Sequence, residues 1–143
     1  MLDLGEGSCV PVATLPAQVL LKSEAHLESA GRRGGIDLED LHAIVRCYDS
    51  VIEDQRRLDV EPLEVLVDGR VEPPDVGAYL LGKDVAELLA GEAFSPLDQL
   101  LQSLNDLYGA EMNTLAGALA ETAVRDHVQS RFRAFALGLE MLV

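Results

Sequence analysis

Residues 19–48, which read VLLKSEAHLESAGRRGGIDLEDLHAIVRCY, decide the fold of this chain. On both sides of the segment GRRGG, apolar residues recur every three or four positions, which is the spacing of amphipathic helices. The glycines of GRRGG interrupt that spacing and indicate a turn. The stretch is therefore predicted to form a helical hairpin.

Helical patterns continue outward from this hairpin in both directions. The first helix is predicted to begin near Leu15, because Pro16 suits a first helical turn. The second is predicted to begin with Asp37 as its N-cap and to run to about Leu58. Further helices are predicted over residues 61–68, 76–90, 95–108 and 110–142, the last as one long helix or as two joined near Gly117.

The remaining N-terminal segment has a weaker pattern. Residues 1–14 are predicted to be a loop or a short edge strand, because Pro11 cannot donate a hydrogen bond to a neighbouring strand. A length of 143 residues suits one domain with one core. The sequence thus predicts an all-α fold over residues 1–143, a bundle of five or six amphipathic helices with at most a short N-terminal extended segment.

The charge of the chain restricts its partners. With 11 basic and 25 acidic residues the formal net charge is −14, which repels long nucleic acids and anionic membranes. The longest stretch without a charge, residues 7–21, is too short to span a bilayer and contains two prolines. The N-terminus begins acidic, whereas a secretory signal begins basic. We therefore expect a cytoplasmic protein that binds neither membranes nor long nucleic acid.

The residues that most often bind zinc are scattered along the chain. His26, His42 and His127 share no ligand spacing, and Cys9 and Cys47 form no paired motif. The two cysteines are expected to be free or buried thiols. No metal ligand and no catalytic residue is assigned from the sequence.

One pattern resembles a known family. It consists of Lys22 in a leucine-rich helix, then Arg32 and Arg33 before two glycines, then Asp37 and Asp40 in the phrase DLEDL. This pattern resembles the C-terminal helical part of the AbiEii-like nucleotidyltransferases, which have a polymerase-β-type catalytic core. The phrase LLGKDVA, residues 80–86, is also similar to a helix found in some of these proteins.

The resemblance implies a substrate site. Lys22 would contact nucleotide phosphates, Asp37 or Asp40 would be the accompanying acid, and Mg²⁺ would enter with the nucleotide. The N-terminal core of the family is missing, because no carboxylates follow Gly7 and Ser8 on a neighbouring strand to bind metal ions. The chain is then expected to bind substrate and to need a catalytic partner subunit. The candidate substrate-binding residues are Lys22, Asp37, Asp40, Asp84, Arg32 and Arg33.

Helix geometry argues against a direct contact between two of these residues. In a plain antiparallel hairpin Lys22 and Asp40 are offset by about 9 Å along the helix axes, so a direct ion pair between them is not expected. Both residues lie at the edge of the apolar stripe of their helix, from which a side chain can line a cleft. The simpler interpretation leaves Asp37 as an N-cap and Lys22 as a surface residue.

Asp84 has an unusual position in the pattern. It lies in an apolar stripe, between leucines four residues away on either side, where an unpaired carboxylate would be costly. One interpretation is a functional acid that faces a cleft. The other is an ion pair with an arginine such as Arg32, Arg33 or Arg125.

Two non-enzymatic alternatives remain open. The charge of −14 suits an acidic, antitoxin-like interaction module that covers a basic surface of a partner protein. Leucine-rich faces in residues 97–107 and 132–142 suit self-association into a homo-oligomer. The mild basic cluster of Arg125, Arg131 and Arg133 is expected to be a solvated helix face.

Overall fold

The computed structural model describes residues 2–3, 9–10, 13–28 and 35–140, and most of these residues are helical. The long helices are α1 (Leu15–Glu28), α2 (Ile36–Cys47), α5 (Val76–Leu89), α6 (Ser95–Ser103) and α8 (Thr122–Glu140). The shorter ones are α3 (Gln55–Asp59), α4 (Leu63–Val67) and α7 (Ala110–Ala116), with 3₁₀ turns η1 (Tyr48–Val51) and η2 (Pro73–Asp75). The predicted all-α fold is confirmed.

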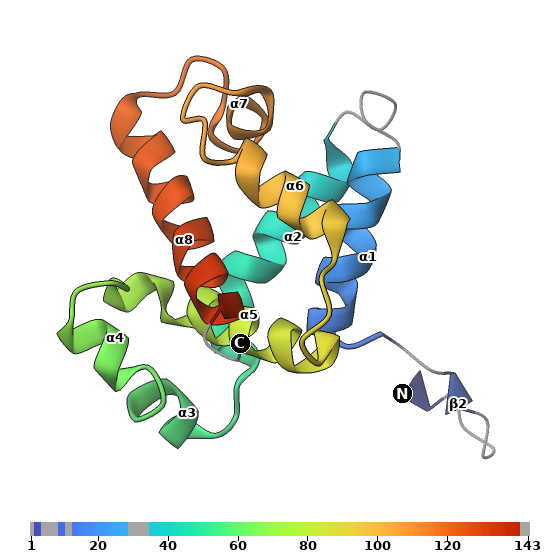
Figure 1. The fold of residues 1–143 in the computed structure, drawn as a ribbon, viewed down its shortest axis with the longest axis vertical. Helices are drawn as coiled ribbons and strands as arrows, with labels where there is room; N and C mark the ends of the chain where they lie inside the picture. Colours follow the sequence, from blue (N-terminus) through green and yellow to red (C-terminus); the bar gives the residue numbers. More distant parts are fainter. Residues whose placement is uncertain (1, 4–8, 11–12, 29–34, 141–143) are drawn as a thin grey trace.

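The described N-terminal residues contain a minimal antiparallel pair, β1 (Leu2–Asp3) and β2 (Cys9–Val10), with Leu2 opposite Val10. Figure 1 shows this pair at the side of the molecule, away from the helices. In the described part of the chain, no helix has both the length and the apolarity needed to cross a bilayer.

The helix predicted from Asp37 to Leu58 is interrupted, and this prediction is wrong beyond Cys47. The chain turns through η1, and Ile52 is extended with φ −81° and ψ 113°. Gly77 of α5 allows this turn, because a Cβ there would lie only 2.8 Å from the backbone nitrogen of Asp49. Asp54 then caps a new helix, α3, by accepting a hydrogen bond from the backbone N–H of Arg56 at 3.0 Å.

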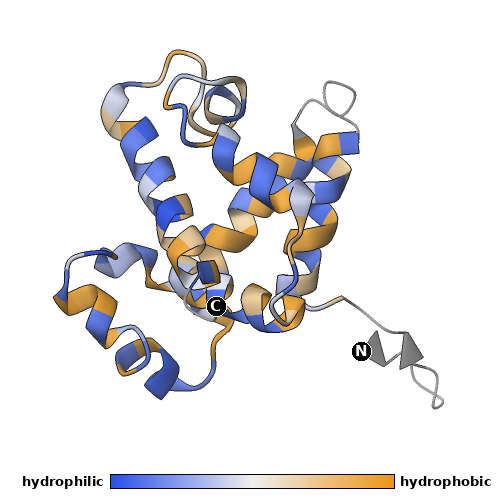
Figure 2. Cartoon of the chain, in the orientation of Figure 1, coloured by the Kyte–Doolittle hydropathy of each residue, from blue (hydrophilic) through white to orange (hydrophobic). Residues whose placement is uncertain are grey.

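The core is built around α5, which packs against α8, α1, α2 and η1. Seven residues of α5 are buried, so this helix is apolar on most sides. The other helices are amphipathic, and Figure 2 shows hydrophobic and hydrophilic residues on different sides of them. Leu97, Leu100 and Leu104 of the leucine-rich α6 region are buried in this core, so that face does not itself require a second copy of the chain.

Arg125 was expected on a solvated face, and that prediction is wrong. Its exposed fraction is 2%, and its guanidinium lies above the ring of Tyr108 at 4.8 Å. The guanidinium donates five hydrogen bonds at 2.7–3.1 Å, to the carbonyl oxygens of Leu107, Gly117, Ala118 and Ala120 and to the side-chain oxygen of Asn113. Arg125 therefore organises the chain between α6 and α8.

His42 joins α2 to α8. Its Nε2 accepts a hydrogen bond from Arg131 at 2.8 Å, and its ring stacks on Phe132 with centroids 5.7 Å apart. Arg131 also lies 3.9 Å from the carboxylate of Asp75. Burial, together with the positive charges of Arg131 and Arg46, lowers the pKa of His42 to about 4. The ring is therefore neutral at physiological pH.

The lowered pKa predicts acid sensitivity. The unfolded chain binds a proton at His42 near pH 6.5, whereas the folded protein resists protonation until about pH 4. The free energy of unfolding should therefore fall by about 1–2 kcal/mol between about pH 7 and pH 5. Urea denaturation of the wild type and of His42→Gln measures this loss. An equal pH dependence in the two proteins would contradict the assignment to His42.

Candidate functional site

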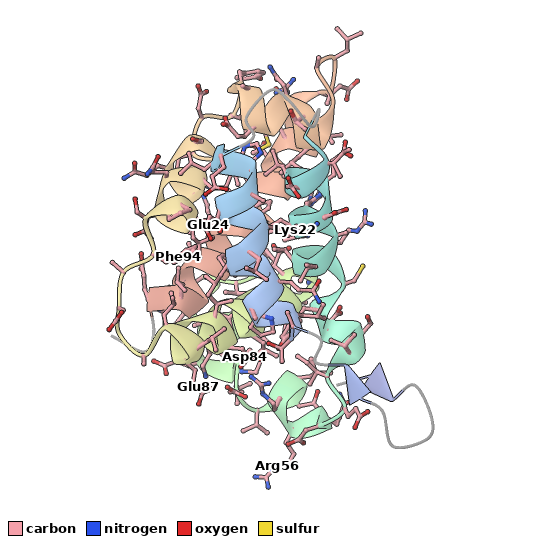
Figure 3. The ribbon with its side chains drawn as sticks, turned by 90° about the vertical axis from the view of Figure 1, so that its right-hand side faces the viewer. Lys22, Glu24, Arg56, Asp84, Glu87 and Phe94 are labelled. Atoms are coloured by element: carbon pink, nitrogen blue, oxygen red, sulfur yellow. The ribbon has the colours of Figure 1, made fainter. Side chains whose placement is uncertain are left out.

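The α1–α2 hairpin brings three of the predicted site residues together. The Nζ of Lys22 lies 2.8 Å from Oδ2 of Asp40 and 3.5 Å from Oδ1 of Asp37. The expectation that Lys22 and Asp40 do not pair directly is therefore wrong. Figure 3 shows Lys22 beside the gap between α1 and α2.

The pairing follows from where the helices begin and end. Lys22 lies about 9 Å before Glu28, the last described residue of α1, and Asp40 lies about 6 Å into α2, which begins at Ile36. The remaining offset of about 3 Å is within reach of a lysine side chain.

Asp37 is not the N-cap that its position suggested. Gly35 is the N-cap of α2, with φ +85°, a conformation that favours glycine. Asp37 lies in the first turn of α2, where a carboxylate is stabilised by the helix dipole, and its side chain is only 3% exposed. Its carboxylate is therefore buried on one side of the cluster.

The electrostatics of this cluster favour a charged lysine. Hydrogen bonding to Asp40, and to a lesser degree the contact with Asp37, raises the pKa of Lys22 despite some desolvation. Two carboxylates face one ammonium, so the cluster carries a net negative charge. The side chains of Lys22 and Asp40 are 30% and 50% exposed, and a ligand from solvent can reach both.

Asp84 forms a second cluster, on α5. Its carboxylate accepts a bidentate pair of hydrogen bonds from Arg57, at 2.6 Å and 3.0 Å, and one from the hydroxyl of Tyr48 at 2.5 Å. The predicted ion pair with Arg125 is wrong, because that guanidinium is buried between α6 and α8. Arg32 and Arg33 lie outside the described residues.

The cluster around Asp84 extends along the surface. Glu61 accepts hydrogen bonds from Nε of Arg57 at 3.0 Å and from Nζ of Lys83 at 2.8 Å. Burial raises the pKa of Glu61, but the two cationic partners outweigh it and the net pKa is lowered. Burial and the hydrogen bond to Asp84 raise the pKa of Tyr48 to about 12, so its hydroxyl remains a donor.

An open cleft of about 570 Å³ lies beside this cluster. Its lining consists of Thr14, Pro16, Tyr48, Arg57, Asp84, Glu87 and Leu88. The cleft thus lies between the start of α1, η1, α3 and the last turns of α5. Figure 3 shows Asp84 and Glu87 below Lys22, towards the start of α1.

The structure therefore divides the predicted site in two. Lys22, Asp37 and Asp40 meet near the start of α2, whereas Asp84 contacts Tyr48, just beyond its end. Neither Tyr48 nor Arg57 was identified from the sequence as a partner of Asp84, although both contact it. One sequence signal was available. Asp54 is a residue type that often caps helices, and it could have indicated that a new helix, which contains Arg57, begins at this point.

Neither cluster is a dedicated metal cage. Among the described residues, no group of three or more histidine, cysteine or acidic side chains is placed to hold a metal ion.

No protein-family model matches the chain, and no curated protein or solved structure is significantly similar to it. The functional interpretation therefore rests on the geometry of the two clusters and on the sequence pattern.

Proposed function

We propose that this chain is the substrate-binding helical part of a nucleotidyltransferase-like protein and that transfer requires a catalytic partner subunit. The observation that carries the proposal is the contact of Lys22 with both Asp37 and Asp40. The sequence pattern selected these three residues for their resemblance to one family. Lys22 comes from α1 and the two aspartates come from α2, yet their charged groups meet.

The cluster has the chemistry that a magnesium–nucleotide complex needs. Mg²⁺ is usually held by one or two carboxylates together with phosphate oxygens, rather than by a cage of protein ligands alone. Asp40 supplies an exposed carboxylate, Asp37 adds negative charge from its buried position beside it, and Lys22 supplies an ammonium for a phosphate oxygen. When bound, the metal ion would neutralise charge on the phosphates.

The same geometry explains why we assign no catalysis to the chain alone. Phosphoryl-transfer sites position metal ions, phosphates and the attacking oxygen together. Among the described residues, neither Lys22 nor Asp40 lines any of the five best-defined clefts. A partner subunit would supply the opposite wall and the missing carboxylates.

The first test is a thermal shift. Magnesium with a nucleoside triphosphate in excess should raise the melting temperature by about 2–5 °C, because a ligand that binds only the folded state stabilises it. Lys22→Ala should abolish this shift. Lys83→Ala is the matched control, since Lys83 is also a partly exposed, ion-paired lysine. No shift with any of the four nucleotides, or an unchanged shift in Lys22→Ala, would refute the proposal.

An acidic interaction module is the second candidate function, and one surface feature favours it. Val60, Leu63 and Val67 are 58%, 54% and 77% exposed on the arm that contains α3 and α4. Figure 1 shows this arm projecting from the rest of the bundle. Exposed apolar side chains on a protein of charge −14 suit contact with a basic partner. If no nucleotide binds, this acidic interaction module becomes the favoured function.

A further inference from the structure

We propose that the cleft beside Asp84 is a second binding site, which takes an ammonium or guanidinium group on an aliphatic stem. This inference does not depend on the proposed nucleotide site, because the two clusters lie at opposite ends of α2. It rests on the hydrogen-bonding groups, the charge and the apolar wall of the cleft. These features favour, respectively, a ligand with several N–H donors, a positive charge and an aliphatic stem.

The cleft is richer in acceptors than in available donors. Tyr48 donates its hydroxyl hydrogen to Asp84, and Arg57 interacts with the same hydroxyl, so the acceptors left for a ligand are those of Asp84 and Glu87. Asp84 accepts three hydrogen bonds and has capacity for about one more. The side chain of Glu87 is exposed, and among the described residues it has no hydrogen-bond or ion-pair partner. These acceptors suit a ligand with several N–H donors.

The charge of the cleft selects a cation. Its lining contains Arg57 with one positive charge, and Asp84 and Glu87 with one negative charge each. Each nitrogen of the Arg57 guanidinium already donates to Asp84 or to Glu61, so its positive charge is offset by these two carboxylates. A ligand ammonium near Glu87 would therefore meet a site of net negative charge, in a protein of charge −14.

The apolar residues that line the cleft favour a ligand with an aliphatic stem. Leu88 is 51% exposed, and it lines the cleft together with Pro16 and Tyr48. An aliphatic chain can lie along these side chains while its charged end reaches Glu87, in the same way that lysine stems lie on apolar surfaces. The volume of about 570 Å³ is in the range of small-molecule sites. A polyamine and a lysine side chain of a partner share this chemistry.

The test uses two probes, spermidine and a short glycine-flanked lysine peptide, in calorimetric titrations of the whole chain. Glu87→Gln should weaken binding by about tenfold, the loss expected for one charge-assisted contact. Glu72→Gln is the matched control: Glu72 is an equally charged, exposed residue that lines none of the described clefts, and its loss should change affinity by less than about twofold.

The outcomes separate the sources of the ligand. Binding of spermidine alone would assign a small polyamine, and binding of the peptide alone would assign a basic side chain of a partner protein. Binding of neither probe would overturn the proposal. Equal weakening by Glu87→Gln and Glu72→Gln would also overturn it, because the attraction would then be that of the whole acidic surface. Lys22→Ala should leave binding unchanged, which keeps this test separate from that of the nucleotide site.

Discussion

Gly138→Ala is expected to destabilise the protein by at least about 3 kcal/mol. Gly138 on α8 and Gly82 on α5 lie where these two helices cross. A Cβ on Gly138 would overlap the carbonyl oxygen of Tyr79 and lie 3.0 Å from the backbone nitrogen of Lys83. Neither backbone group can rotate away, so the helices would have to separate. The contact between α5 and α8 is the most extensive in the fold, and its loss should unfold much of the domain.

The sign of the stability change in Gly138→Ala distinguishes a close helix crossing from an open helix. In an open helix, replacing glycine by alanine stabilises by about 0.5–1 kcal/mol, because alanine is the better helix former. Gly91→Ala is the control, since nothing lies within 4 Å of a Cβ there and only its φ of +85° opposes the substitution. We expect that control to lose about 1–2 kcal/mol. Urea denaturation measures both variants, and a stable Gly138→Ala protein would show that α5 and α8 do not cross at these glycines.

Arg125→Ala is expected to cost about 3–5 kcal/mol, the second large effect. The substitution removes five hydrogen bonds and leaves four carbonyl oxygens and the side chain of Asn113 without their donor. Arg125→Lys should recover only part of the loss, because an ammonium has three donors and lacks the planar fork of the guanidinium. The free energy of unfolding in urea measures the change.

Arg133→Ala provides the matched control for this experiment. Arg133 is on the same helix but exposed, and its substitution should change stability by less than about 0.5 kcal/mol. If Arg125→Ala were as mild as Arg133→Ala, Arg125 would be solvated, as its sequence context suggested. The structure would then be wrong about the chain between α6 and α8.

Helical periodicity was sufficient to predict most of the fold. The helices over 15–28, 76–89 and 122–140 follow stripes of aliphatic residues, and the break near Gly117 is a glycine with φ +102°. Periodicity failed after Cys47, where the next apolar residues keep helical spacing but the chain turns. The reason is a tertiary contact, the approach of Asp49 to Gly77, which no local pattern contains.

The contacts of the candidate site were predictable only where the residues are near in sequence or stand out together in a sequence pattern. Lys22, Asp37 and Asp40 came from such a pattern, and the structure places them together. The need of Asp84 for a partner was also visible, since it lies among leucines. Its actual partners, Tyr48 and Arg57, depend on how the chain turns after α2, so their identity could not be read from spacing.

The most direct test of the central claim is equilibrium binding of magnesium–nucleoside triphosphates, measured by titration calorimetry on the whole chain. The account predicts binding of at least one of the four nucleotides, weakened about tenfold or more by Lys22→Ala and by Asp40→Asn. Lys83→Ala should bind as the wild type does. No binding of any nucleotide, or equal affinities in all four proteins, would contradict the claim that Lys22, Asp37 and Asp40 form a substrate site.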